Sequence, residues 1–431
     1  MEATDPGSVP RPFAARRVSR RRALAQVGIG LAASTFVGPN PGRVAAQGNA
    51  TPAPSRGRDR AADIVASAQG IMESSHLRAV ILRATVGGEE VVTAALGESA
   101  TGVPATAEMR FRNGAVAISY MTTLLLQLVD RGAVGLDDPI APWLPDLPDA
   151  DRVTLRMLAN MTAGYPDYVQ NDRFVDGFYA DPFRAWTPAE LIAIGLSTPR
   201  LFEPGANWDY SHTGYVILGQ ALERIGDAPL GTLLQDNVLG PLGLTGTTSA
   251  ATAAIPEPVL HAFTSERREF LGVDPAMPFY EESTSWNPSW SLAEGAVQTT
   301  TIRDMTATAE AIGTGVLLSP TAHRSQIGPE LLGFGAPLEG CPACHTLDES
   351  YNYGLGVVLA GPWILQNPLF GGYGAIEAYL PSKKVAIAVV TTFGERSFDE
   401  QGNNPHARAS WNIFAAIGSK LAPDDAPPGR R

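Results

Sequence analysis

Hydrophobic and polar positions follow two different periods along the chain, and each change of period marks a predicted element. Apolar side chains recur at helical spacing over residues 61–75, which predicts a helix there. Two β-branched runs at 78–85 and 89–96 flank a pair of glycines, which predicts two strands joined as a hairpin. Helical spacing returns over 114–132, so the order begins as helix, hairpin and helix.

The middle of the chain has mainly helical patterns, whereas the end has mainly strand patterns. Residues 137–245 predict helices and long loops, with Thr154 and Thr187 as helix N-caps. Three strand patterns and a last helix follow, at 353–360, 376–380, 385–393 and 407–421. Because strands from both chain ends can join one sheet, we expect an α/β fold of the α+β type. This fold would have an antiparallel sheet flanked by the terminal helices, with an inserted helical subdomain at about 112–290.

The first residues predict an export signal of the twin-arginine type. Five arginines crowd positions 16–22, a mildly apolar stretch follows at 23–37, and a small-residue cleavage pattern ends at Ala46. A basic tail or a retained anchor is the alternative. No cysteine lies near the cleavage pattern, so a lipid anchor there has no support.

Domain boundaries follow from this signal. We expect the signal peptide at 1–46, a Pro/Ser/Gly-rich linker at 47–60, the main domain at 61–421 and a tail at 422–431. No further stretch reaches the roughly 18–20 apolar residues of a membrane span, so we expect no transmembrane anchor after signal removal. The mature protein is then extracytoplasmic: secreted, periplasmic or associated with the cell wall.

Composition narrows the possible functions. The 431 residues are 44% hydrophobic with a formal charge of −12, which supports a sizeable core and argues against nucleic acid as a partner. Lysine is scarce, because only Lys383, Lys384 and Lys420 are present among 32 basic residues. A mechanism that needs a lysine base earlier in the chain is therefore excluded.

A series of short motifs follows the chain in a fixed order. No single motif is specific, but their order and spacing are. They are Phe111-Arg112-Asn113-Gly114-Ala115, Leu128-Val129-Asp130-Arg131-Gly132, Leu136-Asp137-Asp138-Pro139, Thr162-Ala163-Gly164, Phe202-Glu203-Pro204-Gly205, Tyr210-Ser211-His212, Gly354-Leu355-Gly356 and Gly371-Gly372-Tyr373-Gly374.

This order resembles the serine β-lactamase and penicillin-binding-protein superfamily, in its class C and D-alanyl-D-alanine carboxypeptidase-like branch. The resemblance extends over about 61–421. It implies acyl transfer by a serine and a lysine three residues later, one helical turn away. It also implies a Tyr-x-Asn segment for proton transfer and a Lys-Thr-Gly or His-x-Gly strand that forms one wall of the cleft.

The chain departs from the family at nearly all of these positions. Ala115 stands at the serine position and Ile118 at the lysine position. Tyr210 is retained, whereas His212 replaces the asparagine. The strand motif, Gly372-Tyr373-Gly374, has no cationic or imidazole side chain. The usual acylation chemistry is therefore absent, although backbone N–H groups of an oxyanion hole need no particular side chain.

Other hydroxyls and an imidazole are candidates to replace the missing nucleophile and base. Ser119 lies one turn after Ala115, and its alternative role is a hydroxyl bonded back to the helix backbone. Ser211 neighbours His212, but adjacent side chains rarely point the same way. Tyr210 with His212 is the more credible acid/base pair, the alternative being a lining aromatic and a satisfied loop histidine. Ser119, Ser211 and the three strand residues Gly372, Tyr373 and Gly374 are kept as candidate binding positions.

Cys341 and Cys344 are the only cysteines, in the segment Cys-Pro-Ala-Cys-His. A local disulfide is the expected state in an exported protein. Haem attachment needs a helical haem domain, a thioredoxin-like role needs a βαβ context, and a zinc shared between chains has no other support. No His, Asp or Glu cluster has metal-ligand spacing, so no metal and no cofactor are expected.

Four functions remain in order of preference. The first is a pseudoenzyme that binds a cell-envelope peptide or small acyl ligand in the old cleft. The second is an esterase or amidase with a site rearranged around Tyr210 and His212. An envelope scaffold comes third and a redox protein last. Aromatic residues in loops 165–185 and 265–290 favour a ligand pocket over a scaffold, with simple loop packing as the alternative. The oligomeric state is left open.

Overall fold

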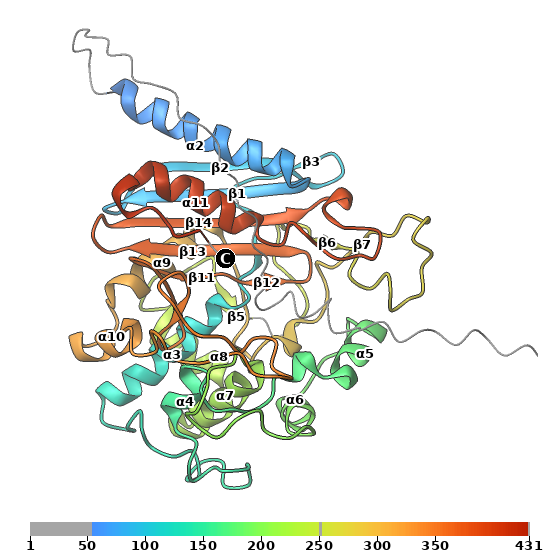
Figure 1. Cartoon of the computed structure of the whole chain (residues 1–431). Helices are drawn as coiled ribbons and strands as arrows, with labels where there is room; N and C mark the ends of the chain where they lie inside the picture. Colours follow the sequence, from blue (N-terminus) through green and yellow to red (C-terminus); the bar gives the residue numbers. More distant parts are fainter. Residues whose placement is uncertain (1–53, 250–251, 430–431) are drawn as a thin grey trace, which may run out of the picture.

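The computed structural model describes residues 54–249 and 252–429 (Figure 1). The predicted signal at 1–46 lies outside the described residues. Helix α2 spans Pro54–Ser74, so it begins inside the stretch expected to be a linker and before the expected boundary at 61. The helix end matches the prediction closely.

One antiparallel sheet crosses the molecule, as expected. Its strand order is β3-β2-β1-β14-β13-β11-β10-β9, with β12 paired to β13. The strands are β1 Leu77–Val86, β2 Glu89–Ala100, β3 Val103–Pro104, β9 Asn352–Tyr353, β10 Val358–Ala360, β11 Trp363–Gln366, β12 Leu369–Phe370, β13 Tyr373–Leu380 and β14 Val385–Phe393. The strand expected at 353–360 is two short strands, because Gly354 N donates to Val357 O and turns the chain between them.

The two chain ends meet at the centre of this sheet. Strand β1 forms the predicted hairpin with β2 on one side and pairs antiparallel with β14 on the other, with Val80 opposite Thr391. Every residue of β13 and β14 is buried. Side chains of a strand alternate between two faces, so complete burial requires cover on both.

Helices provide that cover. Helix α11 (Ala409–Leu421) packs on α2, β13 and β14, whereas α9 (Ile302–Thr314) packs on β1, β13 and β14 (Figure 1). Helix α9, α10 (Pro320–Ile327) and β11 had no sequence prediction. After α11, the indole N–H of Trp363 donates to Asp425 O at 2.8 Å, so the expected tail packs against the sheet.

A helical region lies beside the sheet, below it in Figure 1, as the sequence predicted. Thr154 caps α4 through Met157 N, and Thr187 forms the predicted capping box with Glu190 at the start of α6. Its helices are α3 Val116–Asp130, α4 Leu155–Ala159, η2 Tyr168–Gln170, α5 Asp172–Ala180, α6 Pro188–Gly195, α7 His212–Gly226, α8 Leu230–Leu234, η3 Gln235–Leu239 and η4 Pro288–Trp290.

Small sheets join this region to the rest of the fold. Strands β4 (Phe111–Arg112), β8 (Gln298–Thr300) and β5 (Thr248–Ser249) form one of them, and β6 (Phe263–Thr264) pairs with β7 (Glu281–Glu282). Within 54–249 and 252–429, every helix is too short or too polar to cross a membrane.

Glu377 is a carboxyl buried within β13. It is 2% exposed, and its Oε2 has no hydrogen-bond partner among the described residues. It faces a small gap lined by Ile312, Val357 and Gln366 among others. Burial raises the pKa of Glu377 well above the usual range of a carboxyl, because an isolated charge is costly in an apolar interior. Glu377 is therefore a neutral acid inside the sheet.

Replacing Glu377 with glutamine should stabilise the fold increasingly as pH rises. The pKa of Glu377 in the folded protein lies above the unfolded value of about 4.3. The free energy that the protonated Glu377 contributes to folding is therefore present in full below about pH 4.3 and is lost as the pH rises toward the folded pKa. The stability gain of Glu377→Gln should widen by about 1.4 kcal/mol per pH unit over this window. Urea unfolding from pH 4.5 to 8 measures it, with Glu89→Gln on the exposed part of β2 as control. A gap independent of pH would contradict the assignment.

Candidate functional site

The start of α3 holds the position that the family resemblance assigns to the nucleophile. Gly114 has a φ of +50°, and a Cβ there would lie 2.8 Å from Pro368 Cβ, so the turn into the helix requires glycine. Ala115 occupies the N-cap without a side-chain hydrogen bond and is partly exposed. The first helical turn is therefore accessible at Ala115 but presents a methyl group.

Ile118 belongs to the hydrophobic core. It is 1% exposed, and a Cβ on Gly356 would lie 3.0 Å from Ile118 O and 2.4 Å from Thr122 Oγ1. The Gly354-Leu355-Gly356 segment thus packs closely on α3. The position that would hold the lysine is filled by apolar packing, and Ile118 supplies no proton acceptor beside Ala115.

Two candidate serines serve the backbone. Ser119 is 0% exposed, and its hydroxyl donates to Val116 O at 2.7 Å. Ser211 is the N-cap of α7: it accepts from Gly214 N at 3.2 Å and donates to Tyr165 O at 3.1 Å. These contacts occupy both hydroxyls with local structure.

His212, the first residue of α7, pairs with a carboxylate that sequence reasoning missed. Its Nδ1 lies 2.9 Å from Asp167 Oδ2, and the two residues are each 6% exposed. In the tautomer with a proton on Nδ1, this proton would be donated to Asp167 and Nε2 would be the acceptor nitrogen. Nε2 has no hydrogen bond to the described residues. Asp167 lies 45 positions earlier, and its only local signal is the Asx turn it makes with Val169 N.

Tyr210 contacts the same imidazole. The two rings meet edge to face, with centroids 5.3 Å apart and planes at 71°. Burial raises the pKa of the Tyr210 phenol well above its usual range, and the neighbouring Tyr353, Tyr351 and Asp167 raise it further. Tyr210 is consequently a neutral hydroxyl that can donate a proton rather than a phenolate base. The structure thus brings Tyr210, His212 and Asp167 together.

Aromatic side chains connect this pair with the strand side. Trp290 stacks on Phe370 at 5.4 Å, and its ring centroid lies 6.3 Å from that of His212. Phe370 follows Pro368, which covers Gly114. Most of the loop aromatics expected to line a pocket are buried against one another instead, namely Tyr165, Tyr168, Phe174, Phe178, Tyr179, Trp186, Trp286 and Trp290. Phe183 is an exception at 58% exposure.

The glycine-rich motif forms a tight turn into β13. Gly372 has a φ of +86°, and a Cβ there would lie 2.7 Å from Phe263 O and from Ser283 Oγ. Tyr373 is 1% exposed, and its hydroxyl donates to Leu260 O at 2.5 Å. Gly374 lies against Thr391, whose Oγ1 donates to its carbonyl at 3.0 Å. Tyr373 is therefore a structural anchor in this structure.

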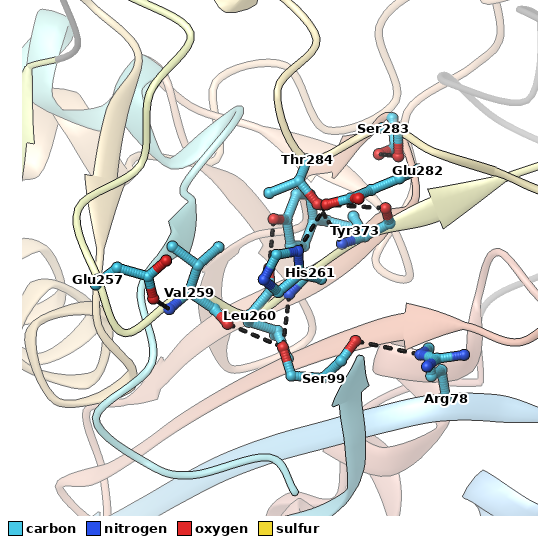
Figure 2. A network of polar contacts seen from close by, with 12 residues as sticks. Arg78, Ser99, Glu257, Val259, Leu260, His261, Glu282, Ser283, Thr284 and Tyr373 are labelled. Atoms are coloured by element: carbon cyan, nitrogen blue, oxygen red, sulfur yellow. Dashed lines mark hydrogen bonds and ion pairs between the residues drawn. The ribbon is translucent and has the colours of Figure 1, made fainter. Parts of the chain in front are cut away.

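Figure 2 shows the surroundings of this anchor. His261 Nδ1 lies 2.6 Å from Glu282 Oε1, and His261 N donates to Ser99 Oγ at 2.9 Å. Thr284 Oγ1 accepts from Ala262 N at 2.9 Å. This network ties β7 to the segment before β6, and it contains no residue of the α3–α7 site.

The cysteines form a disulfide. Cys341 and Cys344 are joined with Cα atoms 5.4 Å apart, and Asp209 Oδ1 lies 3.3 Å from Cys341 Sγ. Burial raises the pKa of Asp209 well above its usual range, with a further contribution from Asp167. The contact with Asp209 was beyond sequence reasoning because 132 positions separate Asp209 from Cys341.

The antiparallel sheet with its flanking helices and the helical region beside it make up the fold of the β-lactamase-like serine hydrolases. The sequence profile described as Beta-lactamase matches residues 64–410, and the chain belongs to this family. Penicillin-binding protein 4 of Amycolatopsis lactamdurans is 31% identical over 180 residues, covering 41% of this chain and 44% of that protein. Esterase EstB of Burkholderia gladioli is 29% identical over 163 residues, covering 35% of this chain and 41% of that protein. The matched segments thus span less than half the length of these relatives.

Solved structures agree on the fold. A D-stereospecific amidohydrolase from Streptomyces sp. superimposes with a TM-score of 0.65 at 23% identity, covering 82% of this chain and 98% of that one. The D-amino acid amidase of Ochrobactrum anthropi SV3, complexed with L-phenylalanine amide, gives the same TM-score of 0.65, identity of 23% and coverage of 82% and 98%. At such identity these likenesses establish the fold alone.

The turn before β13 can be tested by substitution. Gly372→Ala places a Cβ against the Phe263 backbone, which cannot rotate away, whereas Gly102 has a similar φ of +73° with nothing within 4 Å. We expect Gly372→Ala to lower the free energy of unfolding by about 1–3 kcal/mol more than Gly102→Ala. Thermal or urea unfolding of the two variants measures the difference. Equal losses would mean that backbone strain alone fixes this glycine.

Proposed function

We propose that this protein is an extracytoplasmic pseudoenzyme that binds a peptide or small acyl ligand at the start of α3 without forming an acyl-enzyme. One observation supports the proposal: Ala115 is the N-cap of α3 and Ile118 is buried, at the positions that the family resemblance assigns to the nucleophile and its base. Neither side chain has an atom that attacks a carbonyl or accepts a proton. The predicted twin-arginine signal supports the location.

The size of the expected defect follows from general enzymology. Removing a nucleophile and its base together costs several orders of magnitude in rate, because the two groups act as one unit. Apolar packing around Ile118 would also keep out a substitute amine. Binding needs neither group, since shape, aromatic faces and backbone N–H groups recognise ligands.

The names of related proteins, and the compound bound in one solved structure of the same fold, support a class of ligand. The matches include penicillin-binding proteins, and one solved amidase of the same fold is complexed with D-phenylalanine. A D-configured peptide or amino-acid derivative is therefore the first ligand to test. Tyr210, which is only partly buried, would supply aromatic contact area for such a ligand.

The mature chain should form no covalent adduct with a labelled penicillin. Intact-mass spectrometry after long incubation should return the unmodified mass, while a serine β-lactamase in the same assay is acylated. Chromogenic cephalosporins and simple esters should turn over no faster than with an unrelated protein. A penicillin adduct on any residue would overturn the proposal.

Binding is tested separately with N-acetyl-D-alanyl-D-alanine and benzylpenicillin by titration calorimetry or ligand-observed NMR. Tyr210→Ala should weaken binding about tenfold, as loss of one aromatic contact does. Phe183→Ala removes an exposed aromatic from a nearby loop and is the matched control. Equal effects of the two variants would place the ligand elsewhere.

A second function is favoured by the Asp167–His212 pair. His212 Nε2 could take a proton from water, and the resulting hydroxide would attack an ester or amide carbonyl. Asp167 would stabilise the imidazolium, which would then give this proton to the leaving group and restore neutral His212. The products would be a carboxylic acid and an alcohol or amine, with no covalent intermediate.

Under this second function, Asp167→Asn should lower kcat/KM for a p-nitrophenyl ester about a hundredfold or more. His212→Ala should do the same. Asp172→Asn, at an exposed position in the first turn of α5, should leave the rate unchanged. If all three variants match the wild type, the dyad is structural and only the binding function remains.

A further inference from the structure

The disulfide loop and the segment before α7 place three metal-ligating groups together. Asp209, Cys341 and Cys344 each offer one ligand atom, and these three atoms lie within 4.8 Å of one another. All three residues are buried, at 5%, 4% and 6% exposure. No other trio of His, Cys, Asp or Glu in 54–249 or 252–429 meets the same distance criterion.

In the part of the chain that the structure describes, the Asp209 carboxyl contacts a sulfur and not a nitrogen or oxygen donor. Its side-chain contact among the described residues is with Cys341 Sγ, and a disulfide sulfur has no proton to donate. The nearby Asp167, by contrast, accepts from Val169 N and faces His212. The side-chain contact of this buried carboxyl is thus with a disulfide sulfur, and a cation would be a stronger partner for it.

The frame around these groups does not depend on the disulfide. Asn207 Oδ1 accepts from Ala336 N at 2.9 Å, and its Nδ2 donates to Ala336 O at 3.1 Å. Trp208 packs edge-on against His345 at 5.1 Å. Cys344 N also donates to Cys341 O at 3.2 Å, which holds the turn between the sulfurs. Opening the disulfide would therefore leave both thiols facing Asp209.

We infer that the reduced chain binds Zn²⁺ through Cys341, Cys344 and Asp209. Two thiolates and a carboxylate suit zinc, and the Cys-x-x-Cys spacing lets two sulfurs reach one ion. Water completes the tetrahedron. The predicted export route carries folded proteins, so a chain that folds before export meets the cation in a reducing compartment.

The chemistry balances with a dithiol as reductant. The dithiol gives two electrons and two protons to the Cys341–Cys344 bond and becomes a disulfide itself. The two protein thiols then lose their protons to solvent as their sulfurs bind Zn²⁺. A small disulfide, as oxidant, takes the two electrons back with two protons from solvent and becomes a dithiol. This step re-forms the Cys341–Cys344 bond and releases the ion. The disulfide and zinc are therefore alternative states of the same loop.

Cobalt is the probe, because Co²⁺ takes the zinc geometry and is coloured. Full-length mature protein is reduced with dithiothreitol, freed of reductant without oxygen, and titrated with Co²⁺. We expect thiolate-to-cobalt charge-transfer bands and tetrahedral d–d bands that saturate at one ion per chain and vanish on adding Zn²⁺. The oxidised protein should give neither set of bands.

Variants separate the three ligands. Asp209→Asn keeps the shape of the carboxyl and should weaken Co²⁺ binding about tenfold or more, whereas the double variant Cys341→Ser with Cys344→Ser should abolish the bands. Glu339→Gln, an exposed acid in the same loop, should bind like the wild type. Circular dichroism shows whether each variant folds.

Two results would overturn the inference. One is reduced wild-type protein that binds Co²⁺ no better than the folded double-serine variant. The other is an Asp209→Asn variant with unchanged Co²⁺ affinity and unchanged d–d bands. That result would mean that the two cysteines bind the ion and the carboxylate does not. Neither result bears on whether a peptide or acyl ligand binds at the start of α3.

Discussion

The burial of α3 is the constraint on which the rest of the site depends. Residues 116–128 are all buried, so the helix has one possible position between the sheet and the helical region. Gly356 and Gly114 let neighbouring backbone approach it more closely than any larger residue would allow. With α3 fixed, its first turn and the aromatic pair Trp290 and Phe370 are fixed as well.

The same burial explains why an isoleucine suits position 118. A lysine at position 118 would need an ion partner or a hydrogen bond in a region that now packs as core. Isoleucine at that position needs only its apolar neighbours. The chain has therefore kept the architecture of a serine hydrolase while its helix interior satisfies the ordinary rules of a hydrophobic core.

Sequence patterns predicted what depends on neighbours along the chain. The β1–β2 hairpin, α3, the Thr187 capping box and β14 follow from spacing and from local hydrogen bonds, and the structure confirms each. The motif order gave the family, and the family gave the positions of Ala115 and Ile118. The short strand β11 was not predicted, because a run of four buried residues shows no alternation of apolar and polar positions.

Contacts between distant segments could not be predicted in this way. Asp167 beside His212 and Asp209 beside the disulfide both depend on how loops cross in three dimensions. The loop aromatics illustrate the same limit. Their number indicated a ligand pocket, but only packing decides whether a ring faces solvent or another ring, and here most face one another.

The pairing of β1 with β14 also has a consequence for biosynthesis. Strand β1 leaves the ribosome early, yet β14, the partner on its inner edge, lies far later in the chain. Until β14 is made, one edge of β1 has open hydrogen-bonding groups, and neither β13 nor β14 exists to carry α9 and α11. The central sheet therefore closes only after β14 has been made, and until then the open edge of β1 can pair with another chain.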